Sequence, residues 1–265
     1  MTMVLKESTK QKIKDEIIRV VDRVIKKRTI DEPFDIRELE EERPFHVALL
    51  PEEILKGSKF ERSFVTSLGQ SVWEEIARII IEEEWGFCKR GQHIEGEIYQ
   101  AQLRTIQRIL NELEHARGGR KPDWKRELKE VNEAASGEKV KISVVVDLYG
   151  ESKDKKLYCE LKSSKPNSDQ TKVSKEKLLK ICAMKNGENF VVFFALPDNP
   201  YKTKEAYAWP HPKRWFDMTK PPVVIGKDFW DSIGGTGTFE ELIEIFKEAG
   251  KITKPKIRKE FLGLD

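Results

Sequence analysis

Hydrophobic residues recur every three or four positions through the first half of the chain, which is the spacing of amphipathic helices. This spacing predicts helices at residues 8–27, 60–85, 97–117 and 123–135. The Gly118-Gly119 pair ends the third of them. The segment 31–51 is acidic and is interrupted by prolines, so we expect irregular structure there.

From residue 140 onward the spacing changes to that of strands. The stretch VKISVVVDLY, residues 140–149, is rich in β-branched residues, and a polar turn separates it from a second predicted strand at residues 157–162. The two strands therefore predict a hairpin. The remaining predicted elements are a helix at 172–184, strands at 189–196, 205–209 and 223–225, and a helix at 238–249.

The order of these elements predicts an α/β fold, in which helices flank a central mixed β-sheet behind a helical N-terminal extension. No clear linker interrupts the sequence, so we predict a single domain over residues 1–265. Within it we expect the extension at 1–59, a core at 60–200 and a C-terminal elaboration at 201–265.

Charge is distributed unevenly along the chain. The net charge is only +3, which excludes a uniformly basic nucleic-acid coat. Residues 31–42 contain seven acidic residues and one arginine, a net charge of −6, whereas residues 152–185 contain ten lysines and four acidic residues, a net charge of +6. Charged residues make up 36% of the chain, mostly Lys, Glu and Arg, a composition that predicts a thermophilic source.

The cysteines and the apolar runs indicate where the protein resides. The cysteines, Cys88, Cys159 and Cys182, are far apart and form no C-x-x-C pair, which argues against a zinc site and a disulfide framework. No apolar run approaches the roughly 20 residues that span a bilayer, and the N-terminus has no signal-peptide pattern. We therefore expect a cytoplasmic protein with no membrane partner.

The second predicted strand carries two charged residues inside the stretch YCELKSSKPNSDQ, residues 158–170. Glu160 and Lys162 are two positions apart, so their side chains share one face of the strand. If the two strands pair, Asp147 at the end of the first strand lies beside Glu160. Two carboxylates at adjacent strand ends form an oxygen-rich seat for Mg²⁺, and a neighbouring lysine can position or help deprotonate a water molecule.

An E-x-K pair by itself is more typical of the solvated face of a half-exposed strand. The neighbouring sequence favours a catalytic role for this pair. The first strand is apolar except for Lys141 and Ser143 until it reaches Asp147, and a basic, turn-forming K-S-S-K-P-N follows Lys162 directly. Two carboxylates that can hold a metal ion and a lysine beside them are groups suited to phosphodiester hydrolysis.

Asp147, a gap of 12 residues and Glu160-Leu161-Lys162 resemble the PD-(D/E)xK nuclease motif, with Val146 in place of the usual proline. The segment ELKSSKPNSDQ and the tail GKDFWDSIGG are similar to those of type II restriction endonucleases, in particular the group typified by TdeIII and MjaII. The resemblance implies a restriction-endonuclease-like core.

The resemblance also implies a set of catalytic roles. Asp147 and Glu160 would ligate Mg²⁺ with help from the Leu161 carbonyl, and Lys162 would handle the attacking water. Many relatives add a carboxylate from the preceding helix. We expect Glu75 in that role rather than Glu74, because Glu75 borders the apolar stripe of its helix.

Polar residues after the second strand are candidates for contact with DNA: Lys165, Asn167, Gln170 and Lys172. Lysines supply phosphate contacts, whereas Asn and Gln can read base edges. The same residues also fit a helix N-terminus capped by Ser168 or Asp169. The aromatic and basic segment 201–216 adds Lys213 and Arg214, and it fits a packed edge strand and loop equally well.

The function implied by the resemblance is that of a type II restriction endonuclease, which cuts double-stranded DNA at a short, palindromic, GC-rich site of the GGNCC type. Such an enzyme would act as a homodimer with one active centre per strand, and it would need a DNA methyltransferase to protect the host. Two alternatives remain: a nuclease of DNA repair or recombination with the same core, and a non-catalytic DNA-binding α/β protein whose E-L-K sequence is accidental.

Overall fold

The computed structural model describes residues 4–264, apart from the side chains of Leu68 and Gln70. The chain divides into two compact units. The first combines the residues up to Ile76 with those from Glu240 onward, and the second is Ala77–Phe239. The expected single domain with its three subdivisions stays a prediction.

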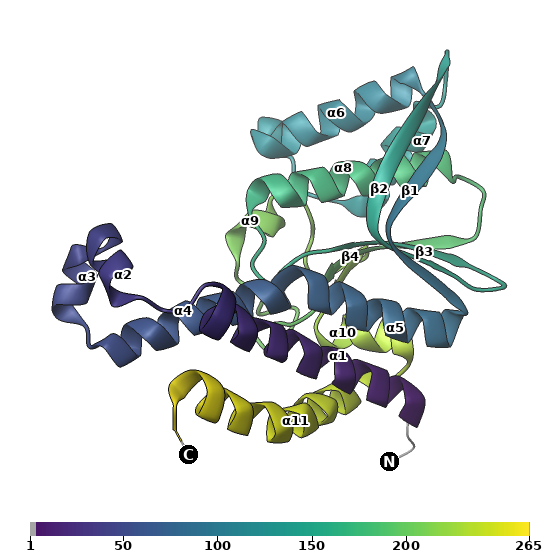
Figure 1. Cartoon of the computed structure of the whole chain (residues 1–265). Coiled ribbons are helices and arrows are strands. Elements are labelled where there is room, and N and C mark those ends of the chain that lie inside the picture. Colours follow the sequence, from purple (N-terminus) through teal and green to yellow (C-terminus); the bar gives the residue numbers. More distant parts are fainter. Residues whose placement is uncertain (1–3, 265) are drawn as a thin grey trace. The chain divides into compact units, whose positions relative to one another are not determined.

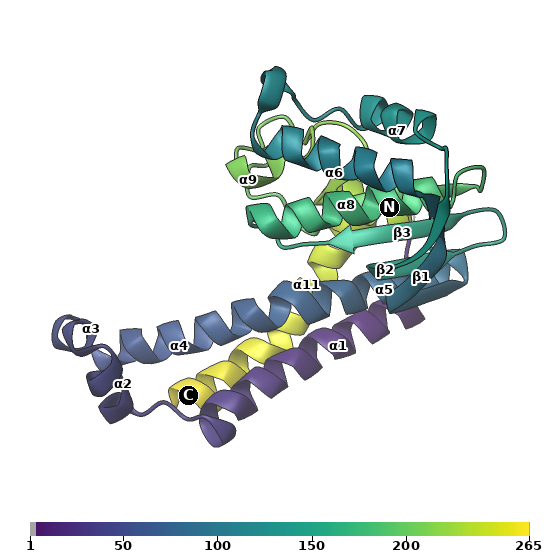
Figure 2. The same cartoon turned by 90° about the horizontal axis from the view of Figure 1, so that it is seen from above.

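The first unit is helical. Its elements are α1 (Glu7–Lys26), η1 (Lys27–Asp31), α2 (Ile36–Glu42), α3 (Pro44–Leu49), α4 (Glu52–Ser67), η2 (Leu68–Val72), the start of α5 (Trp73–Trp85), most of α11 (Thr238–Lys256) and η4 (Ile257–Leu262). Within this unit α1 lies beside α4 and α11, and α2 and α3 lie at the N-terminal end of α4 (Figure 2). The apolar stripe of α1 is buried, as its spacing predicts.

The prediction of irregular structure at 31–51 is wrong, because α2 and α3 form within it. Asp35 caps α2 by accepting a hydrogen bond from the backbone N–H of Arg37. Pro44 opens α3, where a missing N–H costs nothing. The prolines therefore begin or separate short helices here rather than prevent them.

The second unit is built on a five-stranded mixed sheet (Figure 1). Its strands are β1 (Phe87–Tyr99), β2 (Lys139–Glu151), β3 (Lys156–Leu161), β4 (Phe190–Leu196) and β5 (Val223–Ile225), in that spatial order. The pairs β1–β2 and β2–β3 are antiparallel, and the pairs β3–β4 and β4–β5 are parallel. The predicted hairpin and mixed sheet are confirmed.

Two predictions about strands are wrong. Residues 87–99 form β1, and helix α6 (Gln100–Glu114) begins later than the predicted position 97. The alternation of buried Ile94 and Ile98 with polar neighbours marks β1, but partly buried polar residues and a glycine at positive φ, Gly91, weaken that signal. Residues 205–209 form turns and loop rather than an edge strand.

Helices cover both faces of the sheet. Helix α8 (Ser168–Met184) lies on one face, with α6 and α7 (Trp124–Glu133) beside it, and α9 (Pro210–Lys213) follows the 201–209 loop (Figure 1). On the other face Ile81 of α5 lies so close to Gly150 of β2 that a Cβ there would approach it to 2.7 Å, which explains the glycine. Helix α10 (Lys227–Gly234) follows β5. Among the described residues, no helix is long and apolar enough to cross a membrane.

Candidate active site

Asp147, Glu160 and Lys162 meet where β2 and β3 lie side by side. The antiparallel register pairs Leu148 with Cys159, so Asp147 on β2 comes next to Glu160 on β3. Asp147 Oδ2 accepts hydrogen bonds from Lys162 Nζ at 2.5 Å and from the Leu161 N–H at 2.8 Å. Lys162 Nζ is also 3.3 Å from Glu160 Oε2. The lysine ammonium therefore lies between the two carboxylates.

Glu160 is completely buried, with 0% of its surface exposed, and helix α8 supplies two partners that the sequence analysis missed. Lys177 Nζ donates to Glu160 Oε1 at 2.9 Å and to Oε2 at 3.2 Å. Ser174 Oγ donates to Oε2 at 3.1 Å. Residues 174 and 177 are three positions apart and share one helix face. The basic run in α8 hinted at such contacts, but the face that covers β3 is set by tertiary packing.

Two carboxylates, Asp147 and Glu160, and two ammonium groups, Lys162 and Lys177, give this cluster no net charge. Burial raises the pKa of Glu160 above its ordinary value, and the nearby charge of Asp147 adds to the increase. Burial alone would lower the pKa of Lys162, but the charges of Glu160 and Asp147 outweigh it, so the pKa of Lys162 is raised. At neutral pH Lys162 is therefore an ammonium ion. As such, it can orient water and offset phosphate charge, but it cannot accept a proton.

The oxygen donors of Asp147 and Glu160 fit a magnesium ion. Both carboxylates already converge on one cation, the Lys162 ammonium, which shows that the site accommodates positive charge. Mg²⁺ is commonly held by one or two carboxylates while water and substrate phosphates complete its shell. No cluster of three or more His, Cys, Asp or Glu suited to a metal occurs among the described residues. Glu75 is half-buried in the first turn of α5 in the first unit, and its role as a ligand stays a prediction.

The loop that follows Lys162 is held by aromatic side chains from the 201–216 segment. Tyr207 Oη donates to the carbonyl of Ser164 at 2.7 Å, and Trp209 Nε1 donates to the carbonyl of Pro166 at 2.8 Å. The exposed Lys165 places its ammonium 5.9 Å from the ring centroid of Tyr201 and 5.7 Å from that of Trp209. Segment 201–209 thus packs against the loop that follows Lys162, and its aromatic rings lie near the Lys165 ammonium.

The other candidates for DNA contact have distinct surroundings. Asn167, rather than Ser168 or Asp169, caps α8, because its Oδ1 accepts from the N–H of Gln170 at 2.8 Å. Lys172 pairs with Glu114 of α6 at 2.6 Å. Three further candidates, Gln170, Lys213 and Arg214, are exposed. Their contact with DNA stays a prediction.

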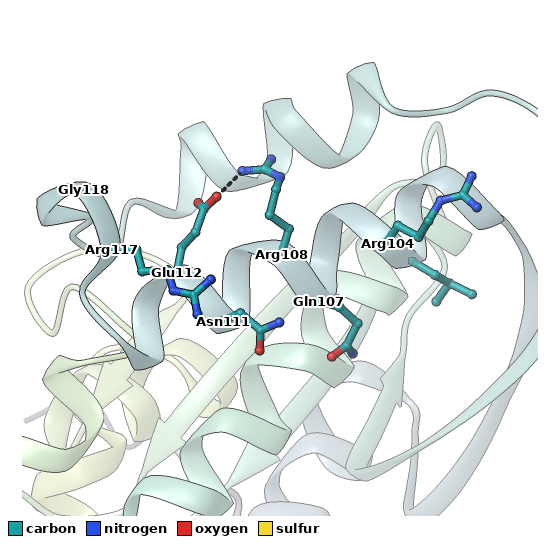
Figure 3. A pocket seen from close by; sticks show the side chains of 8 residues that line it. Arg104, Gln107, Arg108, Asn111, Glu112, Arg117 and Gly118 are labelled. Atoms are coloured by element: carbon teal, nitrogen blue, oxygen red, sulfur yellow. Dashed lines mark hydrogen bonds and ion pairs between the residues drawn. The ribbon is translucent and has the colours of Figure 1, made fainter.

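A hollow of about 690 Å³ runs along the outer face of α6 (Figure 3). Arg108 in this hollow pairs with Glu112 and with Glu130 of α7. Arg104 and Arg117 are exposed, and neither forms an ion pair within the described part of the chain. The hollow thus has surplus positive charge, which the sequence analysis did not single out because α6 as a whole carries both signs.

Comparison with known proteins shows the family of this chain. The model of the family described as type II restriction endonuclease, HinfI, matches residues 9–250. The restriction enzyme HgiCII of Herpetosiphon aurantiacus is 32% identical over 83% of this chain and 82% of its own length. The restriction enzyme MjaII of Methanocaldococcus jannaschii is 29% identical over 98% of this chain and 74% of its own length. No solved structure matches the chain.

These similarities, on a mixed sheet flanked by helices, define the class of protein as an endonuclease that cuts DNA at specific sites. The chain belongs to the HinfI family of type II restriction endonucleases. The similarity to MjaII agrees with the group that the ELKSSKPNSDQ segment resembles.

Proposed function

We propose that this endonuclease is Mg²⁺-dependent and that its PD-(D/E)xK centre consists of Asp147, Glu160 and Lys162. One observation carries the proposal: the Lys162 ammonium lies between two carboxylates from neighbouring strands, 2.5 Å from one and 3.3 Å from the other. An ordinary solvated strand face does not bury a glutamate completely and surround it with cations.

In the proposed reaction each residue has a distinct role. Asp147 and Glu160, with the Leu161 carbonyl, would hold Mg²⁺, which when bound supplies charge stabilisation at the scissile phosphate. Lys162, charged at neutral pH because its pKa is raised, would orient the attacking water and offset charge on the phosphoryl oxygens. Proton removal from that water is therefore not assigned to Lys162 while both carboxylates remain beside it.

We propose that the loop after β3 and the segment around α9 contact the DNA. Lys165, Lys172, Lys213 and Arg214 would contact phosphates. Gln170 and Asn167 would read base edges. Because Asn167 Oδ1 already caps α8, a base contact by Asn167 would use its Nδ2 as a donor. Arg104 and Arg117 of the α6 hollow are further candidates for phosphate contact.

The finer features follow from the resemblance to the MjaII group. We propose a short palindromic GC-rich target of the GGNCC type and a two-fold homodimer. A single site per chain accounts for one strand, and two chains account for both. A protein of this kind would act in the cytoplasm beside a DNA methyltransferase that protects the host.

Incubation with unmodified DNA of known sequence and Mg²⁺, followed by gel electrophoresis, tests the proposal. Discrete fragments are expected, and their sizes would identify the target. A smear or nicked DNA would favour the repair class instead, and intact DNA would favour a non-catalytic binding protein. EDTA should stop cleavage, whereas Ca²⁺ should permit binding without cleavage.

Substitutions at the centre separate chemistry from binding. Lys162→Ala should abolish cleavage while gel-shift affinity stays close to that of the wild type, because affinity depends mostly on phosphate contacts elsewhere. Glu160→Ala should weaken Mg²⁺ binding in a calorimetric titration. Lys180→Ala is the control for the loss of a lysine ammonium, because Lys180 pairs with Glu176 of α8 and not with Asp147 or Glu160. Near-normal cleavage by Lys162→Ala would remove Lys162 from the mechanism.

A further inference from the structure

Lys175 is a buried lysine of α8 that lies between the two residues of that helix which contact Glu160. It pairs with Glu127 of α7, and each of the two side chains is 0% exposed. Ser174 and Lys177, which contact Glu160, leave α8 in another direction. At about 100° per residue, Lys175 leaves the helix roughly 130° from the midpoint between Ser174 and Lys177. Helix α8 is therefore held by β3 on one side and by α7 on another.

Aromatic rings connect this second side of α8 to the strand beside Glu160. The Lys175 ammonium lies 4.9 Å from the ring centroid of Trp124 on α7 and 4.6 Å from that of Phe216. Phe216 stacks on Phe194 of β4, with ring centroids 4.4 Å apart and planes inclined by 13°. Phe194 is the partner of Glu160 in the register of the sheet. Lys175 is thus fixed between α7 and a ring that packs on the strand next to Glu160.

Stability alone does not account for a buried ion pair at this contact. Replacement of a buried pair by well-packed apolar residues is often neutral or stabilising, because the desolvation of both charges offsets their attraction. Orientation of α8 does account for it. A rotation of α8 by about 20° would move side-chain ends at a radius of roughly 5–6 Å by about 2 Å. That shift would break the 2.9 Å and 3.2 Å hydrogen bonds from Lys177 to Glu160.

We propose that the pair of Lys175 and Glu127 sets the rotation of α8, so that Ser174 and Lys177 hold the Glu160 carboxylate in the orientation that DNA cleavage requires. Both members of the pair are positioning residues, because neither is exposed and neither can touch DNA. This inference rests on the proposed function, which assigns Glu160 to the active centre.

Double-mutant cycles of denaturant unfolding in EDTA test the coupling without metal, DNA or activity. In the wild type, Lys177→Met should raise the unfolding equilibrium constant about 30-fold. In the paired variant, Lys175→Met with Glu127→Leu, it should raise that constant less than about fivefold, because Lys177 is no longer held in place. Lys175 and Lys177 share no partner, so a pair that only stabilises the fold would give additive effects. Lys180→Met is the control, since Lys180 pairs with Glu176 and its effect should be equal in both backgrounds.

Single-turnover cleavage at saturating DNA and Mg²⁺ separates positioning from binding. The paired variant should cut at least about tenfold more slowly than the wild type, because a misplacement of about 1 Å in an active site can cost about 100-fold in rate. Its Kd for DNA, measured in Ca²⁺, should stay within about twofold, because Lys175 and Glu127 are buried. Arg126→Ala is the control, since it removes an exposed partner of Glu130 from α7 and should change neither quantity.

Two results would overturn the inference: additive effects of Lys177→Met in the two backgrounds, or a paired variant that cuts at the wild-type rate. Either result leaves the nuclease centre to be judged by Lys162→Ala alone. If the coupling is found but Lys162→Ala cuts normally, the proposed centre fails, and the pair has no part in cleavage.

A paired variant that does not fold is replaced by Glu127→Gln in both experiments. This substitution removes one charge of the pair and keeps the volume of the side chain. It should slow single-turnover cleavage at least about threefold and reduce the effect of Lys177→Met on unfolding. Wild-type values for both measurements would again overturn the inference.

Discussion

Replacement of Lys177 by methionine tests whether the buried glutamate is held by α8. The side chains have similar length, so the substitution removes the ammonium and keeps most of the packing. In the wild type Lys177 Nζ is 2.9 Å and 3.2 Å from the two oxygens of Glu160, which has no exposed surface. The substitution therefore leaves one more negative charge than positive charge in a buried cluster.

The expected loss of stability follows from what remains around Glu160. Removal of the sole partner of a buried ion pair costs about 3–5 kcal/mol, and a single hydrogen bond to a charged group contributes about 1.5–3 kcal/mol. Since Lys162 and Ser174 still contact Glu160 in the variant, the lower range applies. We expect Lys177→Met to lower the free energy of unfolding by about 2 kcal/mol when metal is absent.

The affinity for Mg²⁺ should increase in Lys177→Met, although the stability of the metal-free protein decreases. Two carboxylates with one fewer neighbouring cation attract a divalent ion more strongly, and we expect the Kd for Mg²⁺ to fall by about tenfold, or roughly 1.4 kcal/mol. Added Mg²⁺ should therefore restore most of the stability that Lys177→Met loses.

Denaturant unfolding in EDTA and calorimetric titration with Mg²⁺ provide the two measurements. Lys180→Met is the matched control. It removes the same charge from the same helix, but Lys180 lies about one turn beyond Lys177 and pairs with Glu176 instead of Glu160. In a double-mutant cycle, Lys177→Met should cost much less when Glu160 is already Gln. Equal losses for Lys177→Met and Lys180→Met, or an unchanged Mg²⁺ affinity, would refute the reasoning.

Three further predictions concern DNA contact and stability. Arg104→Ala with Arg117→Ala should weaken DNA binding for all sequences and reduce the slope of log K against log salt by about 1.8; Arg126→Ala, which loses a partner of Glu130, is the control, and an unchanged slope would exclude the α6 hollow. Lys175→Met should cost about 3–5 kcal/mol in denaturant unfolding, because Lys175 pairs with Glu127 where neither is exposed. Lys175→Met with Glu127→Leu should recover most of that loss, and failure to do so would show that the pair is not the cause. Calorimetry should give a Tm above the roughly 45–65 °C of mesophilic domains, and a Tm inside that range would refute a thermophilic source.

The β2–β3 hairpin and the proximity of Asp147, Glu160 and Lys162 could be predicted because both depend on local sequence patterns. The turn between β2 and β3 is short, so an antiparallel hairpin fixes which residues face each other, and Asp147 comes beside Glu160 without knowledge of the rest of the chain. The E-x-K spacing places Glu160 and Lys162 on one face for the same reason.

The features that were missed depend on contacts between distant parts of the chain. Nothing in the sequence of α8 specifies that Lys177 rather than Lys172 covers Glu160, because that choice depends on how the helix is rotated over the sheet. Strand β1 was missed because its pairing with β2 overrides a weak alternation of apolar residues. The tether from Tyr207 to Ser164 joins residues 43 positions apart.

Helix α8 links the loop that carries Lys165 to the buried Glu160. It begins directly after the loop that holds Lys165, and Asn167 caps its first turn. Two turns further on, Lys177 neutralises Glu160 from the same rigid element. If Lys165 contacts a DNA phosphate, as we propose, that contact acts on the helix that also holds the buried carboxylate. Because the cluster of two carboxylates and two lysines is electrically balanced, we expect the protein to fold without metal, and a shift of α8 that withdraws Lys177 would uncover negative charge at Glu160.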